Sequence, residues 1–507
     1  MPHLRRPRPW PRRWLLWIGL GIALRLIFIC FPRPVDDDTW DYLLLGHNLL
    51  HHGIYGVGSG TGISPSLFRL PGYPILLAGF ERLFAPIWPN AWWKTLFLMQ
   101  SAAEICGGLL LAGFARRHLS DRAAEIALAL AMLCPFTAAY DGIALTECLS
   151  VFAVSLGIYA AGRALDAAAA GKTDWQALVA GGGAAAFAML LRPDGCLLLA
   201  ALAGGVFAYT VRARSVQPAG QALRRSLVAA SVVCAAGLLP LVPWTVRNYV
   251  RFQVFQPLAP RYINDPGERV NSGFDRWLRT WSTEYVDTAN VCWNAGEGNI
   301  DLDDIPPRAF DSANQRTRTL ALIGEYNRHD SISATLDSRF GALAAERVRA
   351  HPFRYYVTFP LLRAADMLLR PRTVAFYLDV FWWRWSDHPG QSACAILLGL
   401  INLFYVAAAA WGFVRGRVPW AWMLGGYLVL RLLLLATLEN PEPRYTLECY
   451  PILIVAAAAA LAHKKKPGPT TLAGERETSQ LAVRQSTTDP FVCEISCIPG
   501  FWARLQS

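Results

Sequence analysis

Apolar residues are gathered into long blocks along the chain, and stretches rich in glycine, proline and charged residues separate these blocks. A helix of about 20 apolar residues rises 1.5 Å per residue and so crosses the roughly 30 Å hydrocarbon core of a bilayer. The pattern therefore predicts an all-α polytopic membrane protein with about ten transmembrane helices. The expected spans are 14–31, 91–114, 123–140, 145–165, 175–191, 195–211, 226–246, 391–414, 418–438 and 449–463.

The distribution of charge supports this interpretation and orients the chain. Hydrophobic residues make up 54% of the sequence and charged residues 17%, which excludes a disordered, collagen-like or coiled-coil protein. The net charge of +11 could suggest a nucleic-acid partner, but the basic residues lie at the ends of the apolar blocks, where they mark cytoplasmic loops. Starting from a cytoplasmic basic N-terminus (1–13), the expected inner connections carry Arg116 and Arg117, Arg163 and Lys172, Arg212 to Arg225, Arg415 and Arg417, and Lys464 to Lys466.

Two connections of the predicted transmembrane domain (14–463) are too long to be simple links. Residues 32–90 and 247–390 both fall on the outer face, and loops of this length in compact proteins are usually functional. Within the second loop, the aromatic segment Pro352 to Pro371 is interpreted as an interfacial helix. The polar residues 464–507 are expected to form a cytoplasmic tail.

Carboxylates collect at the start of the first outer loop, in the sequence Asp36-Asp37-Asp38-Thr39-Trp40-Asp41-Tyr42. One interpretation is structural, since Asp38 or Thr39 could cap the helix that follows and acidic residues are favourable in a first turn. The other is catalytic: a carboxylate beside the membrane and partly desolvated could act as a general base. Both interpretations remain open on composition alone.

Charged and aromatic residues from distant parts of the chain are expected on the same side. Arg69 precedes the Pro71-Gly72-Tyr73-Pro74 turn, and a guanidinium binds phosphate through two parallel hydrogen bonds. Other outer connections contribute Asp141 with Glu147, Arg192 with Asp194, and Glu442 with Arg444 and Tyr445. Singly, each is typical of a capping or snorkelling group. Together they would suit a phosphorylated lipid and a polar acceptor.

Other chemistries find less support in the sequence. His47 and His51 have the i, i+4 spacing of metal ligands, but no third ligand at a fixed spacing accompanies them. We therefore assign no metal residue and no cofactor, and leave a divalent cation open. Neither a Walker A, a G-x-G-x-x-G nor a G-x-S-x-G context is present, so nucleotide hydrolysis and serine-hydrolase chemistry are unsupported.

At these positions the sequence resembles the membrane glycosyltransferases that include protein O-mannosyltransferases and lipid A aminoarabinose transferases (glycosyltransferase family 39-like), which have the C-type glycosyltransferase fold. The resemblance covers about residues 14–462. Its motifs are Asp38-x-x-x-Tyr42, Asn48-Leu49-Leu50, Arg69-x-Pro71-Gly72-Tyr73-Pro74, Thr146-Glu147, Pro243-Trp244-x-x-Arg247-Asn248-Tyr249, Ala344-Ala345-Glu346-Arg347 through His351-Pro352, and Arg444-Tyr445.

The resemblance implies a hexosyl- or pentosyltransferase with a polyprenyl-phosphate-linked sugar donor. Its partners would be that donor, a protein, lipid or glycan acceptor and the bilayer, without nucleic acid. Asp38 matches the proposed catalytic base, and its neighbour Asp37 is the alternative base. Substrate-binding side chains are expected at Arg69, Tyr73, Tyr42, Glu147, Arg192, Arg247, Arg444 and Tyr445.

The expected location is a bacterial inner membrane with the active site on the extracytoplasmic side. The main alternative is a polytopic transporter or flippase of an envelope lipid or solute. Transporters place ionisable residues near the bilayer midplane, often within inverted repeats. Here the charges gather at the outer boundary, with Arg25 and Arg431 as the main exceptions, and no internal repeat is visible.

Overall fold

A computed structural model of the chain describes residues 12–31, 37–212, 219–296 and 298–462. The N-terminus before residue 12, Asp36 and the tail 464–507 lie outside these residues, and Asp37 is described by its backbone alone. The first half contains α1 (Arg12–Cys30), α2 (Asp37–His52), β1 (Gly56–Val57), β2 (Ser64–Pro65), α3 (Gly72–Phe84), α4 (Trp92–His118), α5 (Asp121–Met132), α6 (Pro135–Ala138), α7 (Glu147–Ala169), α8 (Trp175–Leu191), α9 (Cys196–Arg212), α10 (Ala219–Leu238) and α11 (Val242–Phe252). The second half contains α12 (Ser272–Arg279), α13 (Tyr285–Asp287), α14 (Ala313–His329), α15 (Ala334–Ala350), α16 (Phe359–Leu369), α17 (Pro389–Val414), α18 (Ala421–Leu435), the 3₁₀ helix η10 (Pro443–Cys449) and α19 (Tyr450–Leu461).

The predicted all-α fold class is confirmed, since the only sheet among the described residues is the two-stranded antiparallel hairpin of β1 and β2. Within the described part of the chain, seven helices are long and apolar enough to cross a membrane, and two shorter apolar helices, α8 and α18, accompany them. The seven are Arg12–Cys30, Trp92–His118, Glu147–Ala169, Pro193–Val211, Gly220–Phe252, Pro389–Val414 and Pro443–Leu461. These nine helices coincide with nine of the ten predicted spans, and the chain is an integral membrane protein.

The tenth prediction, a single span over 123–140, is wrong because the helix ends early. With 12 residues, α5 is about 18 Å long and too short to cross a bilayer alone. Pro135 disfavours helical backbone at the residue before it. Arg25 of α1 donates hydrogen bonds to the carbonyls of Met132 (2.9 Å) and Ala131 (3.4 Å), and so satisfies carbonyl groups at the end of α5.

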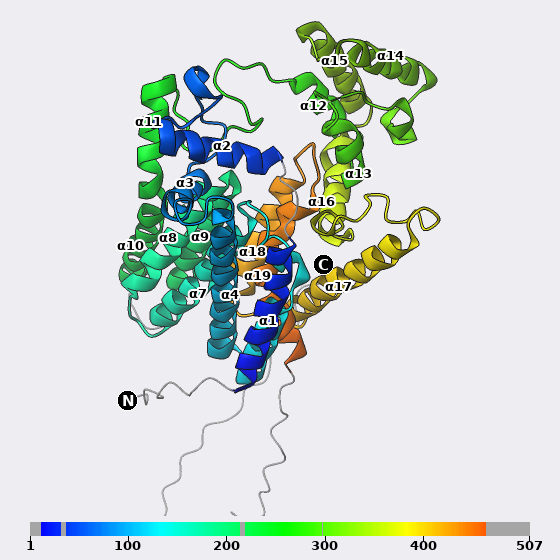
Figure 1. Cartoon of the computed structure of the whole chain (residues 1–507). Coiled ribbons are helices and arrows are strands. Elements are labelled where there is room, and N and C mark those ends of the chain that lie inside the picture. Colours follow the sequence, from blue (N-terminus) through cyan, green and yellow to red (C-terminus); the bar gives the residue numbers. More distant parts are fainter. Residues whose placement is uncertain (1–11, 32–36, 213–218, 297, 463–507) are drawn as a thin grey trace, which may run out of the picture. The chain divides into compact units, whose positions relative to one another are not determined.

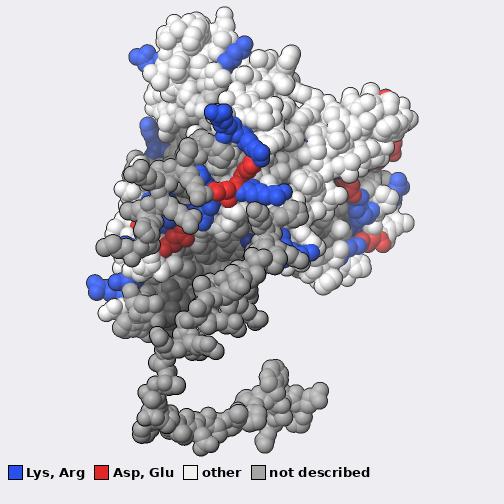
Figure 2. Space-filling view, turned by 90° about the horizontal axis from the view of Figure 1, so that it is seen from below, with Lys and Arg blue, Asp and Glu red and all other residues white. Residues whose placement is uncertain are grey.

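Basic residues of the predicted inner connections come together at one end of the helices. Arg117 pairs with Asp166, which joins the ends of α4 and α7, and Arg163 pairs with Asp174 at 2.7 Å, where α8 begins. Arg225 of α10 donates to the carbonyl of Gly171 at 3.2 Å. Figure 2 views this end and shows basic side chains on several parts of it, with acidic ones beside some of them.

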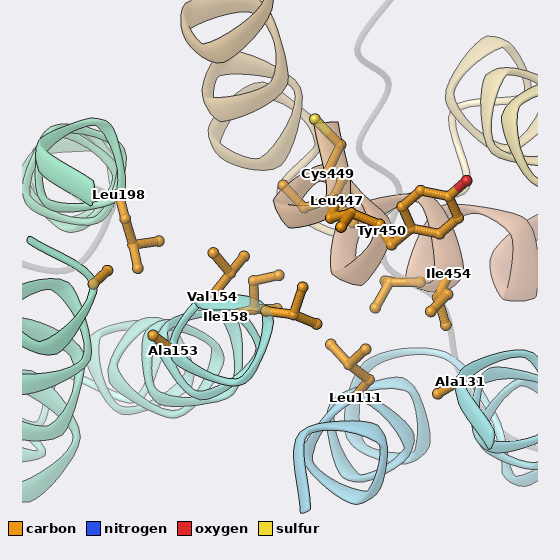
Figure 3. Close-up of a cluster of buried hydrophobic side chains, with 14 of the residues drawn as sticks. Leu111, Ala131, Ala153, Val154, Ile158, Leu198, Leu447, Cys449, Tyr450 and Ile454 are labelled. Carbon is orange, nitrogen blue, oxygen red and sulfur yellow. The ribbon is translucent and has the colours of Figure 1, made fainter. Parts of the chain in front are cut away.

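Small residues let the membrane helices approach closely. A Cβ atom on Gly412 of α17 would lie 2.2 Å from the carbonyl oxygen of Ala456 in α19, so the two backbones touch at this point. Larger apolar side chains of α4, α5, α7, α9 and α19 fill the space between the helices (Figure 3). Leu111, Val154, Ile158, Leu198 and Ile454 are all buried there.

The two long connections are folded. The first contains α2, the hairpin and α3, and a Cβ atom on Gly46 of α2 would lie 2.8 Å from the carbonyl oxygen of Pro74 in α3. The second contains α12, α14 and α15, which lie together in Figure 1. These helices and the segments between them have a hydrophobic core of their own, in which Trp277, Trp281 and Phe340 are fully buried. The segment expected as an interfacial helix is helical over Arg354–Thr358 and α16.

Candidate active site

Asp38 lies in the first turn of α2, the helix that directly follows the first apolar span. The neighbouring Thr39 is buried, and its hydroxyl donates to the carbonyl of Ala144 at 3.3 Å. This contact attaches the start of α2 to the connection that leads into α7. Asp38 is thereby held at the end of the membrane helices, facing residues from later parts of the chain.

Arg69 contacts Asp38 from the loop before α3. The hydroxyl of Tyr55 donates to the carbonyls of Arg69 (3.0 Å) and Leu70 (3.1 Å) and so fixes this loop. The Arg69 guanidinium donates to one carboxylate oxygen of Asp38 and, at 2.7 Å, to Asp41. It also lies 5.4 Å from the centre of the Tyr42 ring, so α2 supplies both the carboxylates and the aromatic face that hold it.

Arg444 contacts Asp38 from the far end of the sequence. It stands near the start of η10, where its Nη2 atom donates to the second oxygen of Asp38 at 2.5 Å and its Nε atom lies 2.6 Å from Glu442. Each oxygen of Asp38 therefore accepts from a different guanidinium. We call Asp38, Arg69 and Arg444 the arginine clamp.

A deeper set of ion pairs continues from the clamp into the helices. Arg444 lies 3.9 Å from Glu147 at the start of α7, and Glu147 accepts from Arg192 at 3.0 Å. Arg192 also lies 3.4 Å from Glu448. Arg431 of α18 completes the set with Asp194 at 2.9 Å and Glu448 at 2.6 Å. Four arginines thus face six carboxylates, which are Asp38, Asp41, Glu147, Asp194, Glu442 and Glu448.

Accessibility decreases along this network. The exposed fraction of the side chain is 34% for Asp41 and 23% for Asp38, but 1% for Arg431 and 2% for Glu448. The clamp is therefore the more accessible end of the network. The buried end positions the arginines, since a buried guanidinium without carboxylate partners would be strongly unfavourable.

The clamp also sets the protonation state of Asp38. Burial by itself would raise the pKa of Asp38, but the guanidinium groups of Arg444 and Arg69 outweigh it and hold that pKa at about 2. Asp38 is therefore ionised at neutral pH and can accept a proton. While both arginines remain bound to it, however, it is a weak base.

Most of the site residues expected from the sequence come together. Asp38, Arg69, Tyr42, Glu147, Arg192 and Arg444 all belong to the network or touch it, and Tyr445 lies with its ring centre 5.4 Å from the Arg192 guanidinium. The side chain of Asp37 lies outside the described residues.

Two expected site residues are not in the network. Tyr73 is fully buried behind the clamp, with its hydroxyl donating to Gln100 at 2.6 Å and its ring 5.2 Å from that of Tyr42. Arg247 donates to the carbonyls of Ser66 (2.6 Å) and Tyr55 (2.7 Å), which ties α11 to the first connection.

The sequence interpretation did not include Glu448 and Arg431 in the site. Glu448 follows Arg444 by four residues within η10, and Arg431 is a charged residue in an otherwise apolar helix. An ionisable residue inside an apolar helix is a functional-site hypothesis by default, and this is the signal that could have identified both.

A group of three potential metal ligands lies apart from the clamp. His47, His51 and Glu81 place ligand atoms within 4.8 Å of one another, the only such group found among the described residues.

The structure thus defines an integral membrane protein with a graded ion-pair network at one end of its helices. No protein-family model matches the chain, and no curated protein matches it.

Among solved structures, the chain is similar to two membrane transferases. One is the Archaeoglobus fulgidus oligosaccharyltransferase tethered with an acceptor peptide (TM-score 0.49, 13% identity, 88% of this chain and 48% of that chain). The oligosaccharyltransferase AglB from Archaeoglobus fulgidus, in complex with an inhibitory peptide and a dolichol-phosphate, matches at TM-score 0.49 and 12% identity (88% and 49%). ArnT from Cupriavidus metallidurans bound to undecaprenyl phosphate matches at TM-score 0.34 and 15% identity (88% and 76%).

The chain spans about half the length of the oligosaccharyltransferase chains that it matches. The matched structures are of the same kind as the membrane glycosyltransferases that the sequence resembles.

Proposed function

We propose that this protein transfers a sugar from a polyprenyl-phosphate-linked donor to an acceptor hydroxyl on the outer face of the membrane, with Asp38 as the general base. The observation that carries the proposal is the arginine clamp: a reachable, ionised carboxylate bound on both oxygens by guanidinium groups from residues 69 and 444. A phosphate group is the ligand that two such arginines bind best.

The clamp suggests an order of events. The donor phosphate takes up hydrogen bonds from Arg69 and Arg444, which then leave Asp38. Without its two cations, the partly buried Asp38 has a higher pKa and becomes a stronger base. The same two side chains, Arg69 and Arg444, therefore bind the donor phosphate and activate Asp38 as a base.

The chemical step balances without a nucleotide or redox cofactor. The acceptor oxygen forms a bond to the anomeric carbon while its proton passes to Asp38, and the bond between that carbon and the phosphate oxygen breaks. The polyprenyl phosphate departs with the bonding electrons. Arg69 and Arg444 stabilise the charge that develops on it.

The buried residues Glu147, Arg192, Asp194, Arg431 and Glu448 act in this proposal as positioning residues. They hold Arg444 in place through Glu147 and do not contact the reacting atoms. The hydroxyl of Tyr42 stays protonated, because burial raises its pKa above the ordinary value, and so it is available as a neutral donor beside Asp38.

The test compares cells that produce the wild-type protein with cells that produce Asp38→Asn, by mass spectrometry of envelope lipids, glycans and proteins. We expect a product that lacks one defined sugar in the variant, with transfer reduced by about 10²–10⁴-fold. Asp121→Asn removes an exposed carboxylate far along the chain, paired with Arg116, and serves as the control that keeps activity. Transfer by Asp38→Asn at the wild-type rate would reject Asp38, and its loss in Asp37→Asn alone would move the role to Asp37.

The transporter hypothesis rests on the charges inside the membrane helices. Arg25 lies 3.0 Å from Glu104 and 3.1 Å from Asp141 and is almost fully buried. Arg25 is already occupied by these two carboxylates and by the carbonyls that end α5, which is a structural role. Release of polyprenyl phosphate by the purified protein would distinguish the two functions, since a transporter would produce none.

A further inference from the structure

Two histidines and a glutamate converge on the side of α2 away from the clamp. His47 and His51 are one turn apart on α2, and their ring centres are 4.3 Å apart. Glu81 projects from α3, and its Oε1 atom lies 3.0 Å from Nδ1 of His47 and 3.1 Å from Nε2 of His51. One carboxylate oxygen is thus shared by two imidazole nitrogens.

The two nitrogen–oxygen distances are close to those between ligands of a tetrahedral metal ion, and all three ligand atoms lie within 4.8 Å of one another. Zinc binds imidazole nitrogen and carboxylate oxygen at about 2.0–2.2 Å, which separates neighbouring ligand atoms in a tetrahedron by roughly 3.3 Å. The two nitrogen–oxygen distances are within a few tenths of an ångström of that value. Two imidazoles and one carboxylate are also a donor set that first-row metals such as zinc accept.

The group is open to the solvent. The side chains of His47 and His51 are 52% and 49% exposed, and that of Glu81 is 16% exposed. An ion can therefore reach the three ligands, and a water molecule can take the fourth position. Glu81, the most buried of the three, belongs to a different helix from the histidines, so an ion bound here joins α2 to α3.

We propose that His47, His51 and Glu81 form a Zn²⁺ site that fastens α2 to α3. Nine residues separate His47 from Asp38, which is about 14 Å along the helix, so the ion does not reach the reacting atoms. Its role is to fix the angle between the helix that carries Asp38 and the helix that follows Arg69. The proposal is independent of the proposed transferase function.

The experiment measures Zn²⁺ binding by the full-length protein purified without a polyhistidine tag. The protein is treated with EDTA, returned to ZnCl₂, desalted and analysed for zinc by mass spectrometry, and its affinity is measured by competition with a zinc indicator dye. We expect one zinc ion per chain and a higher temperature of unfolding in its presence. Binding by Co²⁺ should give the visible absorption of a tetrahedral complex.

Substitutions then identify the ligands. His47→Ala, His51→Ala and Glu81→Gln should each weaken Zn²⁺ binding by about 100-fold or more, since loss of a group that merely supports a ligand already costs roughly 10–100-fold. The matched control is His52→Ala, because His52 is an exposed histidine on the same helix, beside His51. It should bind zinc like the wild type.

The outcomes separate the site from a chance cluster. A wild-type protein that binds no zinc overturns the proposal, as do Glu81→Gln or His47→Ala proteins that bind it as tightly as the wild type. Glu81→Gln keeps the shape of the side chain and should not disturb the fold. Elution of this variant from a sizing column in detergent checks that the fold is intact. A variant that elutes normally and has lost zinc supports the site.

Discussion

The arginine clamp makes a quantitative prediction about the energy that couples Asp38 to Arg444. We consider Asp38→Asn, Arg444→Gln and the double variant, compared with the wild type. Because Arg444 donates to an oxygen of Asp38 at 2.5 Å, each single change removes the same interaction. The double variant should therefore be more stable than the sum of the two losses implies.

The size of this coupling follows from the pKa of Asp38. Lowering that pKa from 3.8 to about 2 corresponds to about 2 kcal/mol at neutral pH, since a shift of one pKa unit is worth about 1.36 kcal/mol. Arg444 lowers the pKa more than Arg69 does, and burial opposes both. Arg444 therefore accounts for more than half of the net lowering, and the coupling energy should be about 1 kcal/mol or more.

The pH dependence has a definite sign. The pKa of Asp38 is lower in the folded protein than in the unfolded chain, so the clamp stabilises the fold fully above about pH 4. This stabilisation is lost as the pH falls from about 4 to about 2. The coupling between Asp38 and Arg444 should accordingly be the same at pH 7 and pH 5.

Equilibrium unfolding in mixed micelles of a mild detergent and SDS measures the free energies of the four proteins. The control cycle uses Arg116 and Asp121, an ion pair of 2.9 Å in which Asp121 is 62% exposed. An exposed pair of this kind should give less than about 0.5 kcal/mol. Additive losses for Asp38 and Arg444, within about 0.3 kcal/mol, would refute the reasoning, and so would a coupling that already declines between pH 7 and pH 5.

Two further predictions concern the membrane helices. Arg25→Met leaves Glu104 and Asp141 buried without their cation and should lower the stability of the protein by about 3–5 kcal/mol, seen as loss of the monodisperse peak on a sizing column. Adding Glu104→Gln and Asp141→Asn should restore part of that peak. A wild-type yield from Arg25→Met alone would contradict this role of Arg25. Gly182→Ala should lower stability by about 1–3 kcal/mol, because its Cβ would lie 2.5 Å from the carbonyl oxygen of Val233 in α10. The matched control is Gly183→Ala: a Cβ atom at the neighbouring Gly183 would have no other atom within 4 Å, so this variant should be as stable as the wild type or more stable. Equal unfolding temperatures for the two variants would exclude close packing at Gly182.

The sequence predicted the spans well because an apolar block of about 20 residues has few alternatives to a membrane helix. It failed at 123–140, where Pro135 is a local signal for the helix end but the freed carbonyl of Met132 is satisfied by Arg25, a residue of another helix 107 positions away. Local propensity contains no information about such a contact. The same limit applies to Glu81, which stands 30 positions after His51 and becomes its neighbour only when α3 packs on α2.

For the site, the sequence could indicate which residues face the same side but not how they pair. The motifs identified Asp38, Arg69 and Arg444 individually, whereas the sharing of Asp38 between two arginines depends on tertiary structure. Tyr73 and Arg247 have the right residue types in recognisable motifs, yet their partners are Gln100 and backbone carbonyls. Side-chain chemistry alone does not distinguish a residue that binds a substrate from one that fixes a loop.

The clamp joins residues that are 406 positions apart in the sequence. At a synthesis rate of about 5–20 residues per second, Arg444 emerges roughly 20–80 s after Asp38. During that interval α2 and the loop before α3 can already pair through Asp41 and Arg69, but the carboxylate of Asp38 has only one of its two cations. The site is therefore completed only when η10, which leads into α19, has been made, and a nascent or prematurely ended chain that lacks η10 and α19 can occupy the membrane without acquiring the site.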